Sequence, residues 1–128
     1  IFAGKASPGD QDGKGLIQRV YRKTGELRGK YGSTVVFVED YDIELGKALV
    51  GGVDLWLNNP MRGKEACGTS GMKVAANWGV NMSVLDGWWP EGYNGRNGFA
   101  IGPYNSLNDS DIDFIHTLAK LKFEAIPA

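Results

Sequence analysis

The hydrophobic residues of this chain follow a helical spacing in some segments and form short continuous runs in others. The spacing predicts a helix over residues 12–24. We expect this helix to end near Gly25, because glycine disfavours helical geometry. The apolar positions of this helix are Leu16, Ile17, Val20 and Tyr21. Residues 34–38 (TVVFV) are β-branched or aromatic throughout, which is typical of a strand buried on both faces in a parallel sheet.

The two types of segment alternate along the rest of the chain. Ile1 to Gly4 reads as the close of a strand. The further elements expected are a helix over residues 42–52, a strand over 53–57, a helix over 69–78 and a strand over 81–85. Alternation of this kind predicts an α/β fold, with a Rossmann-like parallel sheet and helices on both faces.

The last third of the chain follows a different pattern. Residues 85–106 are rich in glycine and aromatic residues, and we expect a loop there. Ser110 opens a segment that resembles a capping box and predicts a final helix. Its expected packing face consists of Ile112, Ile115, Ala119 and Phe123.

Composition restricts the class of protein. A chain of 128 residues with 42% hydrophobic residues is long enough for one domain with a core. The formal charge of -1 gives no overall field that would attract nucleic acid or an anionic membrane. The single cysteine excludes an internal disulfide and agrees with a reducing cytoplasm. Because the first strand lacks its beginning, we expect a piece of a longer polypeptide.

The motif EACGTSGMK, residues 65–73, carries the clearest candidate chemistry. At the amino end of the helix expected from Thr69, unpaired backbone N–H groups and the positive end of the helix dipole converge on one spot. Small residues let an anion approach this backbone closely, which suits a phosphate. Thr69, Lys73 and Asn77 fall on one stripe of the helix, while an expected packing face consists of Met72, Ala75, Ala76 and Gly79.

Spacing alone leaves the role of Lys73 open. This lysine can neutralise a substrate phosphate, form a Schiff base with pyridoxal 5'-phosphate, or remain solvated at the surface of an ordinary capped helix. The Walker A spacing is absent from the motif, which removes that class of phosphate loop.

The motifs together resemble the C-terminal catalytic domain of α-glucan (glycogen, starch or maltodextrin) phosphorylases. The similar segments are AGKASPG, EDYDIELGKALVGGVDLWLNNP, EACGTSGMK and LDGWWPEGYNGRNG, and WLNNP is most like the compact bacterial and archaeal members. The resemblance implies that residues 1–128 are part of the C-terminal, cofactor-binding domain of a GT-B fold, without the N-terminal domain.

The resemblance also implies the site residues. Lys73 would form the Schiff base with pyridoxal 5'-phosphate, the backbone at Thr69, Ser70 and Gly71 would hold the cofactor phosphate, and Tyr41 would lie against the ring. The segment Glu65, Ala66, Cys67 and Gly68 would bind the hydroxyls of the glucosyl unit. Lys5 would grip the substrate phosphate. No metal is implied.

Two positions depart from the family pattern. Cys67 stands where serine is common, which weakens the side-chain hydrogen bond and leaves sugar contacts to the backbone. Asp42 stands where the animal enzymes carry arginine, so that arginine's role does not transfer.

The activity implied is phosphorolysis of α-1,4-glucan by inorganic phosphate, giving α-glucose 1-phosphate with retained configuration. The full-length parent is expected to be a cytoplasmic homo-oligomer that binds neither nucleic acid nor membrane, and the fragment alone is expected to be inactive. Two alternatives stay open: a GT-B glucan synthase that uses a nucleotide sugar, and a non-catalytic module that binds glucan or phosphate.

The remaining polar and aromatic candidates have plainer explanations. Trp88, Trp89 and Tyr93 form either a sugar platform or the apolar anchor of a glycine-rich loop, and we favour the anchor. Asp86, Glu91 and Asn94 lack the EF-hand spacing for calcium. His116 is expected at the surface.

Overall fold

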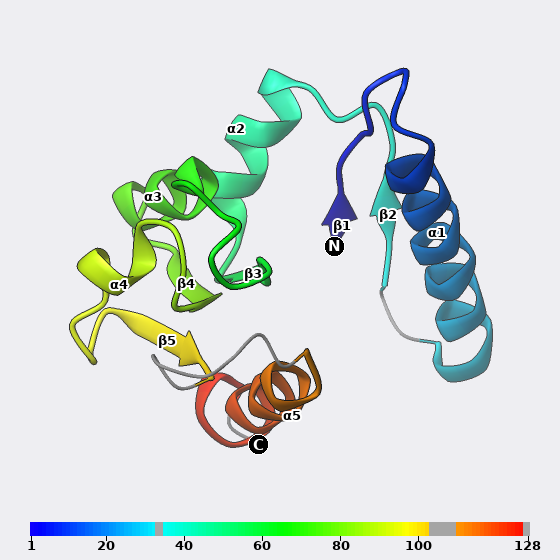
Figure 1. Ribbon diagram of the computed structural model, residues 1–128. Coiled ribbons are helices and arrows are strands. Elements are labelled where there is room, and N and C mark those ends of the chain that lie inside the picture. Colours follow the sequence, from blue (N-terminus) through cyan, green and yellow to red (C-terminus); the bar gives the residue numbers. More distant parts are fainter. Residues whose placement is uncertain (33–34, 103–109, 127–128) are drawn as a thin grey trace. The chain divides into compact units, whose positions relative to one another are not determined.

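The computed structural model describes residues 1–32, 35–102 and 110–126, and its chain divides into two compact units. Unit 1 covers residues 1–46 and unit 2 covers residues 47–128. Each unit is an arrangement of helices and parallel strands in its own right (Figure 1).

Unit 1 contains two short parallel strands with one long helix beside them. Strand β1 (Phe2–Ala3) pairs in parallel with β2 (Phe37–Val38), so that Phe2 lies opposite Phe37. Helix α1 (Gln11–Tyr31) connects them, and its Tyr21 ring meets Phe37 edge-on at 6.3 Å between centroids. Thr34 of the strand expected over residues 34–38 lies outside the described residues, and pairing begins only at Phe37.

The prediction that α1 ends near Gly25 is wrong. The helix continues through Gly25 and Gly29 to Tyr31 and stops at Gly32, whose φ of 60° is left-handed and whose N–H bonds to Arg28 O at 3.1 Å. A glycine inside a helix costs about 1 kcal/mol and does not terminate it, whereas the left-handed cap does. At the other end, the Asp10 carboxylate accepts a hydrogen bond from Gly13 N at 2.8 Å.

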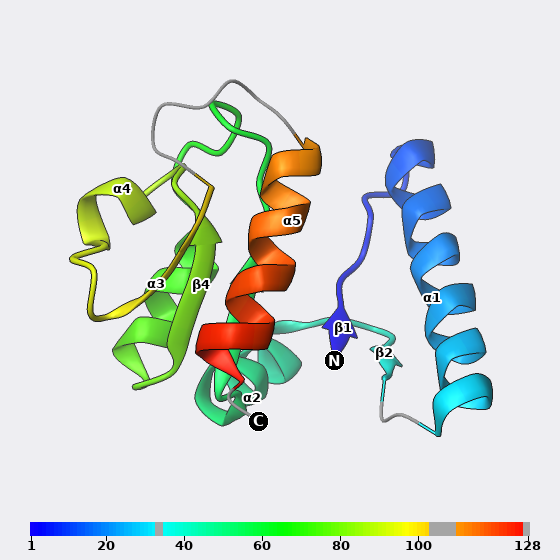
Figure 2. The ribbon, with the colours of Figure 1, turned by 90° about the horizontal axis from the view of Figure 1, so that it is seen from below.

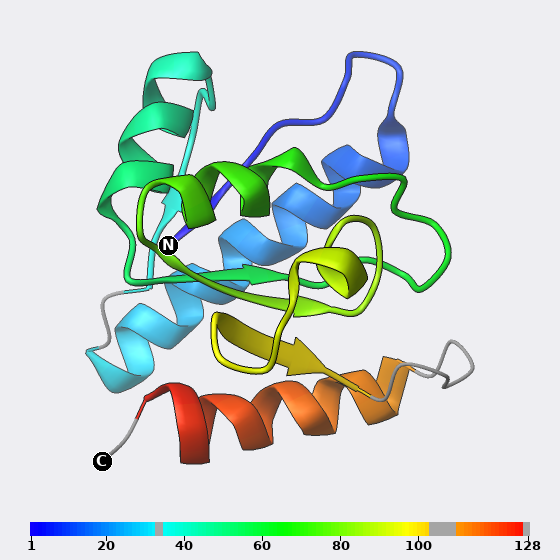
Figure 3. The same ribbon diagram turned by 90° about the vertical axis from the view of Figure 1, so that its left-hand side faces the viewer.

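Unit 2 is built on three parallel strands in the order β3-β4-β5. Its elements are α2 (Ile43–Gly52, which begins in unit 1), β3 (Leu55–Asn58), α3 (Thr69–Ala76), β4 (Val80–Val84), α4 (Trp89–Gly92), β5 (Gly98–Ile101), α5 (Ser110–Lys120) and the π-helical turn η1 (Leu121–Ala125). Figures 2 and 3 show α5 running alongside β5 while α3 covers β3 and β4. The α/β prediction with parallel strands is therefore confirmed.

The central strand β4 separates an apolar face from a polar one. Met82 and Val84 are fully buried and pack with Ile101, while Leu121 of η1 packs against the same cluster. Since side chains alternate along a strand, Asn81 and Ser83 point to the opposite face, and Asn81 meets α3 there. Four consecutive buried residues in β4 are what a strand covered on both faces requires.

The loop predicted over residues 85–106 is wrong for its described part, because α4 and β5 lie within it. Trp89 is only 1% exposed and its indole N–H donates to Phe99 O at 3.1 Å, so it anchors the segment to the new strand. Gly98 leaves room for this packing, because a Cβ there would collide with Asn81 O. A strand of four residues between glycines has too weak a sequence pattern to predict.

Two expected helix faces are also wrong. Ile112, Ile115 and Ala119 on α5 and Phe123 on η1 are exposed. The residue of α5 that turns inward is Asp113, which pairs with Arg62 at 2.7 Å with both side chains 8% exposed. On α3, the inward residues are Gly71 and Val74, whereas Met72, Ala75 and Ala76 of the expected face are exposed. Gly79 of that expected face lies beyond the end of α3 and is half-buried.

We expect the Met82→Ala substitution to lower the free energy of unfolding by about 2–5 kcal/mol, because a fully buried side chain leaves a cavity. The matched control is Met61→Ala, which removes a 66% exposed side chain and should change stability by about 0.5 kcal/mol at most. Chemical denaturation followed by tryptophan fluorescence measures both, since all four tryptophans lie in unit 2. Equal losses in the two variants would contradict this assignment of the core.

Candidate functional site

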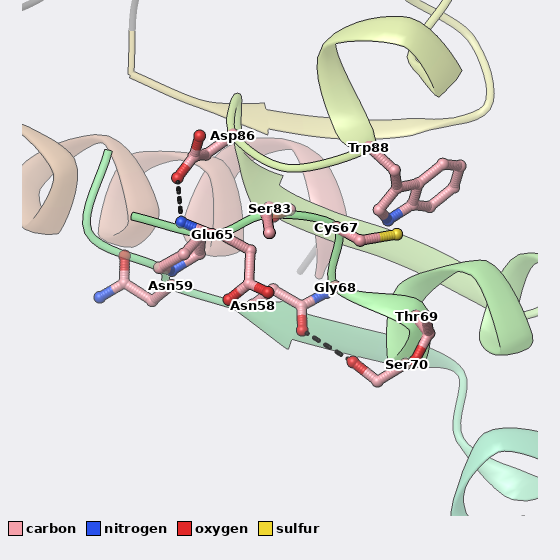
Figure 4. A pocket seen from close by; sticks show the side chains of 12 residues that line it. Asn58, Asn59, Glu65, Cys67, Gly68, Thr69, Ser70, Ser83, Asp86 and Trp88 are labelled. Carbon is pink, nitrogen blue, oxygen red and sulfur yellow. Dashed lines mark hydrogen bonds between the residues drawn. The ribbon is translucent and has the colours of Figure 1, made fainter. Parts of the chain in front are cut away.

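A pocket of about 670 Å³ opens in unit 2 where β3 and β4 end. Because β3 and β4 are parallel neighbours, their carboxyl ends lie at one edge of the sheet, and the segments that follow each strand meet there. The residues that line the pocket are Asn58, Asn59, Pro60, Glu65, Ala66, Cys67, Gly68, Thr69, Ser70, Ser83, Asp86 and Trp88. Figure 4 shows these side chains around the start of α3.

The start of α3 offers backbone donors to this pocket. Gly68 precedes the helix in a left-handed conformation (φ 79°, ψ 57°), and no side chain caps the helix. The first N–H groups of a helix have no partner inside the helix, and they carry its positive dipole end. With the hydroxyls of Thr69 and Ser70 beside them, these donors favour an anion.

A cluster of amides and an indole lies beneath the helix start. Asn58 Nδ2 donates to Asn81 Oδ1 at 2.8 Å, and Asn58 Oδ1 accepts from Trp56 Nε1 at 3.1 Å and from Ser70 Oγ at 3.4 Å. Gly71 is buried directly above: a Cβ at this position would lie 2.8 Å from Asn81 Oδ1. The polar face of the sheet therefore supports the first turn of α3.

The turn after β4 is hydrogen-bonded to the segment that leads into α3. Asp86 Oδ2 accepts a hydrogen bond from Glu65 N at 3.0 Å, drawn as a dashed line in Figure 4. Partial burial raises the pKa of the Asp86 carboxyl, but backbone N–H donors at Glu65, Gly87, Gly63 and Lys64 outweigh it and lower the pKa below its ordinary value. The carboxylate is thus the favoured form in the folded chain.

The same two segments make a second hydrogen bond two residues further along the chain. Trp88 N donates to Cys67 O at 2.9 Å. Gly87, with φ 59°, lies so close that a Cβ there would be 2.5 Å from Cys67 O. The Cys67 thiol contacts Met72 Sδ at 3.8 Å, a weak interaction.

Most of the predicted sugar- and phosphate-binding residues line this one pocket. These are Glu65, Ala66, Cys67, Gly68, Thr69 and Ser70. Gly71 and Lys73 are not among the lining residues. Lys73 is exposed on α3, one helical turn beyond Thr69, and its carbonyl accepts from Asn77 Nδ2 at 2.8 Å.

Lys5 and Tyr41 belong to unit 1. Lys5 is exposed and borders a pocket of about 300 Å³ formed with neighbours that include Phe2 and Leu16. Tyr41 is half-buried, with its hydroxyl close to Gly46.

Sequence reasoning missed several lining residues, among them Asn58, Ser83 and Asp86. The signal for Asn58 and Asp86 is their place at the ends of adjacent parallel strands. Trp88 lines the pocket while Trp89 is buried, so the anchor interpretation is confirmed for Trp89. His116 is exposed, as expected.

Within residues 1–32, 35–102 and 110–126, no helix combines the length and apolar character needed to span a bilayer. In that same described part of the chain, no group of three or more His, Cys, Asp or Glu side chains is arranged to hold a metal ion.

We expect Gly71→Ala to lower the free energy of unfolding of unit 2 by about 1–3 kcal/mol, because the new methyl group overlaps three polar groups. Gly51→Ala on α2 is the matched control, since nothing lies within 4 Å of its Cβ position. That control should be neutral or stabilise by about 0.5–1 kcal/mol. Denaturation curves that rank the two variants in the opposite order would contradict the close approach at Gly71.

The lowered pKa of Asp86 predicts a specific pH dependence of stability. Its carboxylate contributes stability above the ordinary aspartate pKa, and this contribution is lost as pH falls through the lower folded pKa. Asp86→Asn should therefore be less stable than the parent at pH 7, and the difference should shrink below about pH 4. Unfolding free energies measured from pH 7 to pH 2.5 test this; a constant difference would contradict it.

The model of the family "Carbohydrate phosphorylase" matches residues 1–90. A glycogen phosphorylase of Aquifex aeolicus is 48% identical over 99% of this chain and 18% of its own length. A maltodextrin phosphorylase of Thermococcus litoralis is 45% identical over 94% of this chain and 14% of its own length, and a glycogen phosphorylase of Mycobacterium tuberculosis is 46% identical over 87% and 13%.

The chain thus spans less than a fifth of the length of these curated relatives. The family match nevertheless covers all of unit 1 and about half of unit 2, and it includes the whole lining of the pocket, from Asn58 to Trp88. The chain belongs to the carbohydrate phosphorylase family.

Proposed function

We propose that this chain is part of an α-glucan phosphorylase that transfers a glucosyl unit from an α-1,4-glucan to inorganic phosphate. The glycosidic bond breaks, the leaving oxygen takes a proton from the orthophosphate, and an oxygen of that phosphate bonds to the glucosyl carbon, which gives α-glucose 1-phosphate with retained configuration. The observation that carries the proposal is the start of α3, which no side chain caps. Its backbone N–H donors border the pocket at the carboxyl ends of the parallel strands β3 and β4. The relatives named glycogen and maltodextrin phosphorylases support the same substrate class.

The proposal places residues 1–128 in the C-terminal domain of a GT-B fold, as a Rossmann-like unit. Parallel strands with helices between them, and a pocket at their carboxyl edge, support this placement. In a GT-B enzyme the site is completed by another domain. We therefore expect the N-terminal domain of the full-length parent protein to supply the other wall of the site. We also expect that parent to be a cytoplasmic homo-oligomer.

The donor set at the start of α3 suits pyridoxal 5'-phosphate. Unpaired N–H groups with the hydroxyls of Thr69 and Ser70 would hold its phosphate, and the backbone of the buried Gly71 would complete this first turn of the helix. Lys73, four residues after Thr69 and exposed, would hold its aldehyde carbon. Tyr41 would lie against the ring. When bound, the cofactor supplies a phosphate monoester with a second pKa of about 6, which suits proton transfer at neutral pH.

The rest of the pocket suits the sugar. Glu65 carries an exposed carboxylate that can accept hydrogen bonds from glucosyl hydroxyls, and the backbone through Gly68 adds further polar groups. Lys5 would neutralise the attacking phosphate. A phosphate beside the helix start also gains from the dipole there, which lowers the cost of bringing anions together.

Lys73 distinguishes the proposed function from the two alternatives. A GT-B synthase that uses a nucleotide sugar needs an anion site but no lysine that reacts with an aldehyde, and a binding module needs neither. A full-length protein that consumes a nucleotide sugar, and that forms no glucose 1-phosphate from glucan and orthophosphate, would contradict the proposal.

We expect pyridoxal 5'-phosphate followed by borohydride to label Lys73 in the full-length protein that carries this sequence. Peptide mapping and absorbance measure the label. In Lys73→Ala the label should fall to the background level, because Lys73 is the lysine that α3 places one turn beyond the helix start. Lys64→Ala, which removes an exposed lysine directly before Glu65 of the pocket, is the matched control and should keep the label. Retention of a stoichiometric label in Lys73→Ala would count against the cofactor role.

A further inference from the structure

We propose that the turn 86–88 is the positioning element of the glucosyl-binding segment 65–68, with Asp86 and Gly87 as its positioning residues. This inference rests on the proposed function, because it states what the turn does for that same pocket. Neither Asp86 nor Gly87 needs to touch the reacting atoms in this role. They act through the backbone that presents Glu65 and the start of α3.

Two hydrogen bonds attach the turn to the segment at points that flank Ala66. Glu65 N donates to Asp86 Oδ2 at 3.0 Å, and Trp88 N donates to Cys67 O at 2.9 Å. The first bond comes from a side chain and the second from the main chain. Together they fix both ends of a peptide of three residues, which limits rotation of the chain between them.

Gly87 lets the two backbones approach closely enough for both bonds. Its φ of 59° lies in the left-handed region, which disfavours any side chain. A Cβ would also lie 2.5 Å from Cys67 O and 2.9 Å from Cys67 C, so the segment would have to move. The conformation and the contact demand glycine independently.

Asp86 gathers several donors of the same loop. Its carboxylate accepts a hydrogen bond from Glu65 N, and the backbone N–H groups of Gly63, Lys64 and Gly87 also contribute to lowering its pKa. An ionised acceptor makes stronger hydrogen bonds than a neutral one. The glycine-containing loop before Glu65 therefore has a fixed path although its residues 63–66 are exposed.

The consequence for substrate binding follows from the position of Glu65. Its carboxylate can select glucosyl hydroxyls only if its main chain is held in one place, and a misplacement of about 1 Å can cost two orders of magnitude in rate. The donors at the start of α3 are supported separately, by Asn58 and Asn81 beneath Gly71. Loosening the turn should therefore affect the sugar more than the phosphate-binding donors.

The test uses the full-length protein that carries this sequence, loaded with pyridoxal 5'-phosphate, in the variants Asp86→Asn and Gly87→Ala. We expect KM for glucan to rise or kcat to fall so that kcat/KM for glucan drops about tenfold or more in both. KM for orthophosphate and the cofactor content should stay within about twofold of the parent. Hydrogen exchange at the amides of residues 63–68 should become faster.

Two further variants complete the design. Glu91→Gln removes an exposed carboxylate from the neighbouring helix α4 and should leave all these values unchanged. Asp86→Glu keeps the charge and the acceptors, displaced by one methylene, and should restore part of the glucan kcat/KM. If Asp86→Asn fails to fold, Gly87→Ala and Asp86→Glu still give the comparison.

Several outcomes would overturn the inference. An effect in Asp86→Asn but none in Gly87→Ala would mean that Asp86 binds the sugar directly. Parallel losses of sugar, orthophosphate and cofactor affinity would mean that the turn only stabilises the fold, and an equal effect of Glu91→Gln would mean a general charge effect. If instead the parent protein neither binds the cofactor nor cleaves glucan, the proposed function fails, while the amide exchange still reports on the turn.

Discussion

The parallel pairing of β3 with β4 is the constraint on which the candidate site depends. Leu55 lies opposite Val80 and Asn58 opposite Ser83, so both strands end at the same edge of the sheet. This register places Asn58 within 2.8 Å of Asn81 and brings the two following segments together. A shift of β4 by one residue would send every one of its side chains to the other face, and Met82 and Val84 would take the place of Asn81 and Ser83.

Three glycines turn this strand geometry into a pocket. Gly68 takes the left-handed conformation that starts α3, Gly71 lets the helix rest on the amide cluster, and Gly87 lets the next turn approach Cys67. Each position requires glycine for a different reason: the backbone conformation at Gly68, the close packing at Gly71, and both at Gly87. The density of small residues around EACGTSGMK thus reflects the approach of three chain segments as well as access for an anion.

The sequence predicted this site where chemistry and local spacing coincide. The helix start at Thr69 followed from small residues and a helical pattern, whereas the segment Glu65 to Gly68 followed from the family resemblance, and both border one pocket. The turn at Asp86 depends on contacts about twenty residues apart, which no local pattern encodes. The expected face of α5 failed for a related reason: Asp113 turns inward because Arg62, distant in sequence, supplies a buried partner with which it forms a pair at 2.7 Å.

The polar face of β4 supports the pocket but lowers the free energy of unfolding. Asn81 is fully buried and its Nδ2 has no hydrogen-bond partner among the described residues, which costs about 1–3 kcal/mol. On the other face, burial of Met82 and Val84 contributes about 1.5–3 kcal/mol for each side chain, enough to offset that cost. An apolar residue at position 81 would remove the penalty, but Asn58 would then lose the acceptor for its Nδ2. The first turn of α3 would rest on a surface that no longer fixes its orientation.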